Sequence, residues 1–215
     1  MTLQANLKAI TEGVRQQAPA EVFAAIEAAN AKLEISGIAG RALKAGDRIP
    51  DFDLPDATGK VVRSADLLAA GPLVISFYRG SWCPYCSLEL KTLQQNLSEF
   101  RARGATLVAI SPQTPDESLT TKEKNELAFP VLSDAGSKVA RKFGLVFTLD
   151  ETLKPIFKAF GIDLLAHNGV DTWELPIPAT YVVAKSGKIV SACVDVDYRN
   201  RAEPAEILKS LDKAE

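Results

Sequence analysis

The sequence predicts an α/β protein with a central mixed β-sheet flanked by helices, and three observations support this. Apolar runs at residues 73–78 and 105–110 enclose a helical stretch, the pattern of a parallel β-α-β unit. Residues 180–184 and 189–196, joined by a Lys-Ser-Gly-Lys turn, form the pattern of an antiparallel hairpin. The chain has 215 residues, 47% of them hydrophobic, which is enough for one main domain with an ordinary core.

A helical extension is expected before that core. Apolar residues recur at helical spacing over residues 3–14 and again over 22–33, and glycines interrupt the pattern over 37–46. We therefore expect a helical arm at residues 1–44 and the main domain at residues 45–215. The apolar stripe of the arm must be covered, either by its own domain or by a second subunit, so a homodimer stays open.

The elements of the main domain follow in order. We expect a short hairpin (49–54 and 61–62), a helix (65–70), a strand (73–78), one helix carrying Leu90, Leu93, Leu97 and Phe100, a strand (105–110), a helix (117–127), a strand (130–132), helices at 137–143 and 151–160, an irregular stretch (163–177), the late hairpin and a helix (204–211). Open α/β sheets place their sites outside the carboxyl ends of parallel strands. The loop after the first core strand is therefore the expected site.

That loop contains Cys83-Pro84-Tyr85-Cys86, two thiols spaced as neighbours on one helical turn. Pro84 suits the first position of a helix, where its missing N–H would be unpaired anyway. The free N–H groups and positive dipole at a helix start favour a thiolate, which is the form that attacks peroxides and disulfides. At that position Cys83 is expected to be the more exposed thiol. The motif predicts redox chemistry.

Composition excludes several other classes of function. A net charge of −2 with mixed signs indicates neither a nucleic-acid nor a membrane partner. Neither a membrane span nor a signal peptide is expected, because Lys8, Glu12 and Arg15 interrupt the N-terminal segment, so we expect a cytoplasmic location. Zinc normally needs four ligands, and Cys193 with His167 lacks the usual pair spacing, so no metal or other cofactor is expected.

Residues 77–86, followed by Glu89-Leu90, resemble without a gap the active-site loop of the alkyl hydroperoxide reductase and thiol-specific antioxidant family of peroxiredoxins. Residues 46–54 and 179–187 are similar to the opening and the late hairpin of that family, so the resemblance covers about residues 45–212. It implies a thioredoxin-like fold and a thiol peroxidase that reduces hydrogen peroxide or alkyl hydroperoxides without a cofactor. It also implies recycling by thioredoxin, glutaredoxin or glutathione.

Three residues depart from the family pattern. Cys83 stands where the family has threonine, Arg79 where it has proline, and Pro178 where many members carry an active-site arginine. Trp82-Cys83-Pro84 and Ile177-Pro178 are instead similar to thioredoxin and its disulfide-reductase relatives, in which a cis proline lies against the cysteine pair. Dithiol exchange with protein disulfides is therefore one alternative function, and a redox-sensing binding module is another.

The resemblance makes Cys86 the cysteine that peroxide oxidises to a sulfenic acid, with Cys83 closing a disulfide. The helix-start argument gives the opposite order, so the order stays open, with Cys86 preferred. Arg79 is a candidate for stabilising the thiolate, and its alternative is a solvated loop arginine. The residues expected to support the thiolate or the transition state are Arg79, Trp82, Pro178 and Thr180.

The remaining candidates have structural explanations. On the last strand, Cys193 is expected to face away from Val190, Ala192, Val194 and Val196 and to pack rather than to resolve a disulfide. Arg199 is expected to pair with nearby acids and His167 to lie in a surface turn. Core packing, rather than an organic-peroxide pocket or a dimer contact, is expected for Phe143, Phe147, Phe157, Phe160 and Trp173.

Overall fold

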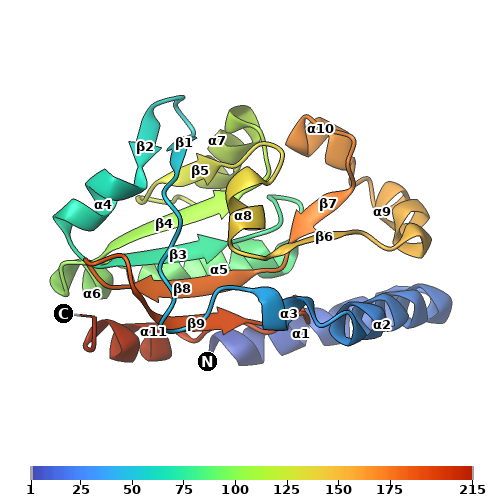
Figure 1. The fold of residues 1–215 in the computed structure, drawn as a ribbon. Coiled ribbons are helices and arrows are strands. Elements are labelled where there is room, and N and C mark those ends of the chain that lie inside the picture. Colours follow the sequence, from blue (N-terminus) through green and yellow to red (C-terminus); the bar gives the residue numbers. More distant parts are fainter. Residues whose placement is uncertain (1, 215) are drawn as a thin grey trace.

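A five-stranded mixed sheet lies at the centre of the computed structural model, which describes residues 2–214 (Figure 1). The strand order is β5-β4-β3-β8-β9. The parallel strands are β3 (Leu73–Phe77), β4 (Thr106–Ser111) and β5 (Val131–Ser133), and β8 (Ala179–Val183) and β9 (Ile189–Val194) complete the sheet as antiparallel strands. The predicted α/β fold, with its parallel unit and its late hairpin, is confirmed.

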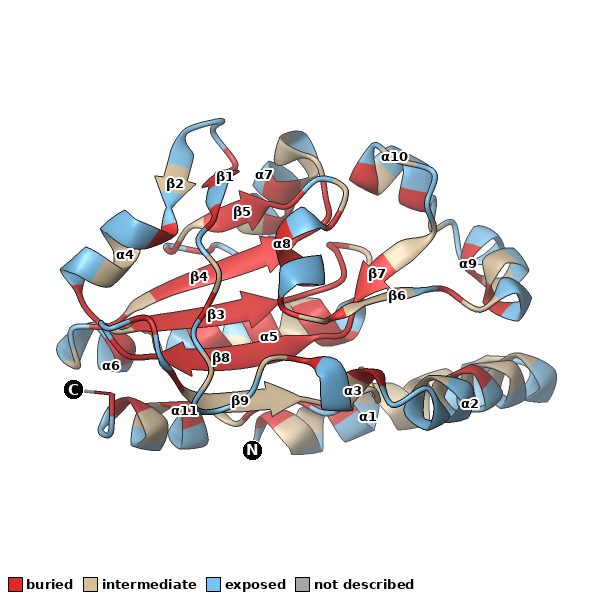
Figure 2. Ribbon diagram, viewed as in Figure 1, coloured by how far each residue is buried: buried red, intermediate tan, exposed pale blue. Residues whose placement is uncertain are grey.

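Apolar side chains project from both faces of the sheet, so β3, β5 and β8 are buried along their length and β4 nearly so, whereas the edge strand β9 is mostly half-buried (Figure 2). Within β3, Val74 faces one core cluster, and Ile75 and Phe77 face the other. The first cluster is covered by α1 (Leu3–Gln17), α5 (Pro84–Gln95), α6 (Leu97–Ala102) and α11 (Pro204–Leu211). The second is covered by α3 (Ile38–Arg41) and α8 (Lys138–Lys142), with Phe77, Phe143 and Tyr181 in ring contact.

The helical arm packs on its own domain. Leu3 and Leu7 of α1 are buried in the first core cluster, and α1 contacts α5. The second arm helix, α2 (Ala20–Ile35), contacts the 3-10 helix η1 (Glu151–Leu153). The two predicted arm helices are confirmed, whereas the division into units at residues 44 and 45 stays a prediction.

Two predicted segments differ from the structure. The helix expected through Leu97 divides at Asn96, whose side chain donates back to the Thr92 carbonyl at 2.8 Å. The stretch expected to be irregular contains α10 (Leu164–Asn168) and β7 (Glu174–Pro176), and β7 pairs with the unpredicted β6 (Val146–Thr148). Pro176 in β7 argues against a strand, and no turn motif joins β6 to β7, so the sequence predicts neither. The other elements are β1 (Asp53–Pro55), β2 (Val61–Arg63), α4 (Ser64–Ala70), α7 (Pro115–Lys124) and α9 (Lys154–Ala159).

A register shift in the late hairpin corrects one further prediction. Ser191 pairs with Val182 and Ile189 pairs with Val183, so Val190 falls in the irregularity between them. Val190 therefore packs on the first core cluster together with Cys193, and it does not share the face of Ala192, Val194 and Val196. Nothing among residues 2–214 forms a helix of the length and apolarity that a membrane crossing needs.

Candidate active site

The cysteine loop lies at the carboxyl end of β3, as the sequence predicts. Cys83 is the N-cap residue of α5, and Pro84 occupies the first turn. Both Cys83 and Cys86 have an exposed fraction of 0%. The expectation that Cys83 would be the more exposed thiol is wrong, because the segment after β9 folds back over the pair and places the Tyr198 ring 5.3 Å from the ring of Tyr85.

Arg79 contacts the first thiol of the pair. Its Nη2 lies 3.1 Å from Cys83 Sγ, and its guanidinium stacks 3.8 Å from the centre of the Tyr198 ring. The side chain is buried, so the alternative of a solvated loop arginine is excluded. A guanidinium fixed at this distance stabilises a thiolate and any negative charge that develops beside it.

A second guanidinium contacts the other thiol. Arg201 Nη2 lies 3.5 Å from Cys86 Sγ, while its Nε donates to Glu89 Oε2 at 2.8 Å. Thr180 donates to the other oxygen of Glu89 at 3.4 Å, and Arg201 also donates to the Tyr198 and Asn200 carbonyls. Both side chains of this ion pair are buried, so each charge offsets the free-energy cost of burying the other.

The sequence analysis does not predict the Arg201–Glu89 pair as part of the site. Glu89 belongs to the family-like loop, but nothing local shows which arginine near residue 200 turns inward. Arg199 turns outward and pairs with Asp197 at 2.7 Å and with Glu27 at 2.5 Å, as predicted. Arg201, on a different segment from Pro178, is thus the buried arginine that contacts Cys86.

The two thiols differ in acidity. Burial opposes ionisation of Cys83, but the hydrogen bond with Cys86 and the charges of Arg79 and Arg201 hold the pKa of Cys83 well below its usual value. Burial, together with the hydrogen bond and charge of Cys83, raises the pKa of Cys86 well above its usual value. These directions favour the thiolate on Cys83 over the thiolate on Cys86. Burial also raises the pKa of Glu89 to about 7, in spite of Arg201.

Replacing Arg79 by methionine is expected to raise the pKa of Cys83, because the thiolate loses its nearest cation while it stays buried. The midpoint of thiolate formation should move upward by about 1 to 3 pH units. Ultraviolet thiolate absorbance as a function of pH measures this directly. Arg79→Lys, which keeps the charge, is the matched control and should move the midpoint less. An unchanged midpoint in Arg79→Met would contradict this role.

The peptide bond before Pro178 is trans, since no cis peptide occurs among residues 2–214. The analogy with the thioredoxin relatives therefore does not extend to the cis geometry at this proline. Ile177 and Pro178 are the only residues between β7 and β8 and carry the chain directly from one strand into the next. Trp82 packs with its ring centre 5.4 Å from that of Phe157, and its Nε1 lies so close to Gly80 that a Cβ there would come within 2.3 Å.

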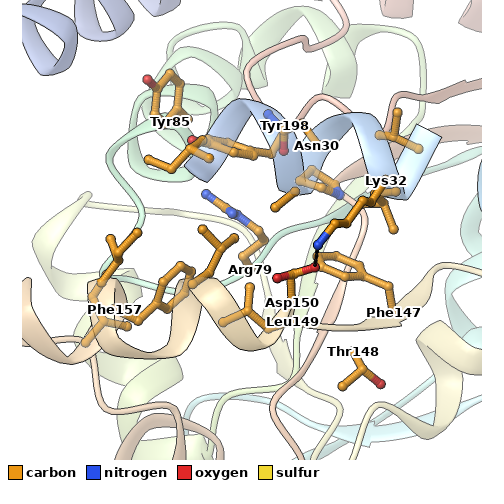
Figure 3. A pocket seen from close by; sticks show the side chains of 18 of the residues that line it. Asn30, Lys32, Arg79, Tyr85, Phe147, Thr148, Leu149, Asp150, Phe157 and Tyr198 are labelled. Carbon is orange, nitrogen blue, oxygen red and sulfur yellow. Dashed lines mark hydrogen bonds and ion pairs between the residues drawn. The ribbon is translucent and has the colours of Figure 1, made fainter. Parts of the chain in front are cut away.

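A cavity of about 350 Å³ borders the cysteine loop, and its lining includes Arg79 and the neighbours of Cys83 but not the two cysteines (Figure 3). Arg79, Trp82 and Pro178 form part of its wall, opposite α2 and α9. The expectation of core packing for the aromatic residues is confirmed for Phe143, which is fully buried. It is confirmed for Phe157, which is a buried member of a third core cluster, and Phe147 and Trp173 pack against that cluster. It is wrong for Phe160, which is exposed, and Phe147, Phe157 and Phe160 also line the cavity.

Polar contacts behind the loop hold its backbone. Ser81 N donates to Gln113 Oε1 at 2.9 Å, and Gln113 Nε2 donates to Glu117 at 3.2 Å. His167, expected in a surface turn, lies in the short helix α10 with Nδ1 2.8 Å from Glu117. Within residues 2–214, no group of three or more His, Cys, Asp and Glu side chains could hold a metal ion.

A paired thiol site at the carboxyl end of β3 in this mixed sheet defines a thiol-based redox enzyme of thioredoxin-like fold. The sequence matches the AhpC/TSA family over residues 45–192, so the chain belongs to that family. A putative peroxiredoxin of Mycobacterium tuberculosis is 31% identical over 72% of this chain and 87% of the relative. Peroxiredoxin Bcp of Escherichia coli is 35% identical over 48% of this chain and 65% of the relative.

The crystal structure of peroxidoxin BcpB from Mycobacterium tuberculosis is also similar. It superimposes with a TM-score of 0.63 at 25% identity, covering 80% of this chain and 99% of that chain. The family match and these relatives make the protein a peroxiredoxin-type thiol peroxidase, which uses a peroxide substrate and a thiol reductant.

Proposed function

We propose that the protein reduces hydrogen peroxide or alkyl hydroperoxides through a cysteine sulfenic acid and a Cys83–Cys86 disulfide. The observation that carries this proposal is the pair of thiols held between two buried guanidinium groups. A thiolate attacks the peroxide, so that an S–O bond forms, the O–O bond breaks, and the released oxygen leaves as water or an alcohol after taking a proton. The second thiol then attacks the sulfenic sulfur, which forms the disulfide and releases water.

Two orders of attack have support. Cys86 occupies the reacting position of the family-like loop and contacts Arg201, whereas the lowered pKa and the Arg79 contact favour Cys83. We assign the attack to Cys86 because it holds the reacting position of the family-like loop, although the lowered pKa of Cys83 favours the proton that the two thiols share lying on Cys86. Transfer of that proton across the hydrogen bond between the two thiols exchanges their states. Cys83 as the attacking thiol is the second candidate.

Burial of both sulfur atoms favours a peroxide, whose reacting group is only two oxygen atoms, over a protein disulfide as the oxidising substrate. A protein disulfide must approach the thiolate in line, and the segment after β9 stands in its way. A protein reductant needs that same segment to move aside before it reaches the disulfide. The reductant, whether thioredoxin, glutaredoxin or glutathione, stays a prediction, as do the cytoplasmic location and the homodimer.

Single-turnover kinetics test this function. The reduced protein, mixed with one equivalent of hydrogen peroxide in a stopped-flow instrument, should consume the peroxide faster than a free thiol does and should lose two free thiols per chain. Peroxide loss no faster than that of a free thiol would exclude the peroxidase function for this site. Rapid turnover with an oxidised protein substrate would instead support disulfide exchange, and slow stoichiometric oxidation would support a redox sensor.

A further inference from the structure

One wall of the cavity beside the thiols comes from the helical arm. Ala29 and Leu33 of α2 line it together with Leu153 and Phe157, and Ala29 packs in the same core cluster as those two residues. Figure 3 shows the arm helix lying over the space that Arg79 enters. The arm lies outside residues 45–192, the part of the chain that matches the AhpC/TSA family. The α2 wall of the cavity therefore comes from residues outside the part of the chain that matches the family.

Two ion pairs fix α2 over the cavity. Lys32 Nζ lies 2.8 Å from Asp150 Oδ2 at the rim, where Figure 3 draws the contact, and Glu27 pairs with Arg199 at 2.5 Å. Arg199 follows Tyr198, whose ring stacks on Arg79. The segment containing Tyr198 and Arg199 therefore connects α2 to Arg79, which contacts Cys83.

The lining is mostly apolar, but at Arg79 it presents the guanidinium that contacts Cys83. Trp82, Phe147 and Phe157 contribute aromatic surface, while the Arg79 guanidinium ends 3.1 Å from Cys83 Sγ. Hydrogen peroxide is small and polar, so it gains little free energy from contact with apolar side chains. An organic group gains free energy when it leaves water for them, and a cavity of about 350 Å³ is in the range that holds small organic ligands.

We propose that α2 makes this cavity the binding site for the organic group of a bulky apolar hydroperoxide, with the peroxide group held at Arg79 beside the cysteine pair. This inference rests on the proposed peroxidase function and names its substrate class. The chemical step is the one given above, with the organic group leaving as its alcohol. The specificity element is the arm, so the preference for organic hydroperoxides depends on residues outside the family's domain.

Filling the cavity from α2 tests the proposal. The measured quantity is the ratio of kcat/KM for cumene hydroperoxide to kcat/KM for hydrogen peroxide. In Ala29→Trp this ratio should fall by at least about 10-fold, because the indole occupies the space of the organic group. Ala28→Trp is the matched control, since Ala28 is the exposed neighbour on the same helix and lies outside the cavity wall, and its ratio should stay that of the wild type.

Ala29→Leu provides a smaller filler if the tryptophan variant does not fold, and it should lower the ratio in the same direction. An unchanged ratio in the folded Ala29 variants, with both peroxides consumed, would overturn the proposed substrate class and leave the peroxidase function intact. A wild type that consumes neither peroxide would overturn both.

Discussion

Replacing Cys86 by serine is expected to lower kcat/KM for peroxide by at least about 10³-fold, because a serine hydroxyl does not ionise near neutral pH and cannot attack the O–O bond. In Cys83→Ser, by contrast, one equivalent of peroxide should still be consumed. A sulfenic or sulfinic acid should then accumulate at Cys86, since no neighbouring thiol is left to close the disulfide. Stopped-flow kinetics and peptide mass spectrometry measure the two results.

Cys193→Ser is the matched control for these variants. Cys193 packs on the first core cluster, and burial raises its pKa to about 11, so it stays protonated and should not react. Peroxide turnover should therefore remain at the wild-type level. A sulfenic acid at Cys83 in the Cys86→Ser protein, with an unmodified Cys86 in Cys83→Ser, would establish the opposite order of attack.

Replacing Arg201 by methionine is expected to lower the free energy of unfolding by about 3 to 5 kcal/mol, because it leaves Glu89 buried without its cation. In a chain of 215 residues a loss of 1 kcal/mol corresponds to roughly 2–4 °C in Tm. Urea unfolding at pH 8 is the right measurement. Glu89, with a pKa of about 7, is mostly charged there in the wild type, so the ion pair is present to be lost.

Two further variants separate charge from packing. Arg199→Met removes a neighbouring arginine whose partners are partly exposed, so it should cost about 1 kcal/mol or less. Combining Arg201→Met with Glu89→Leu removes both buried charges and should restore most of the lost stability. A double variant as unstable as the single one would show that Arg201 acts through its packing and that the buried charge of Glu89 is not the cause.

Features that depend on neighbouring residues could be predicted from the sequence, and features that depend on distant segments could not. The position of the cysteine loop depends on one strand, one proline and one helix start within about 20 residues, so the pattern of apolar residues predicts it. The helix start at Pro84 and the late hairpin followed in the same way. The strands β6 and β7 were missed because no turn motif links them, and β7 contains Pro176, a residue that argues against a strand in the sequence.

The surroundings of the thiols also depend on contacts between segments that are distant in sequence. Arg201 and Glu89 are 112 residues apart, and Arg199 has the same side-chain chemistry two positions earlier. Which arginine turns inward depends on how the segment after β9 folds over α5. The same holds for the cavity, where Ala29 looks like any other alanine of an alanine-rich helix until α2 packs opposite Phe157.

By itself, therefore, the sequence determined the α/β fold, the helical arm and the redox pair Cys83 and Cys86, because each is written in neighbouring residues. Only the tertiary structure decided that both thiols are buried, that Arg79 contacts one and Arg201 the other, and that the arm closes a cavity beside them. The physical reason is that burial, charge pairing and cavity shape arise from contacts between distant segments, and such contacts leave no periodic trace along the chain.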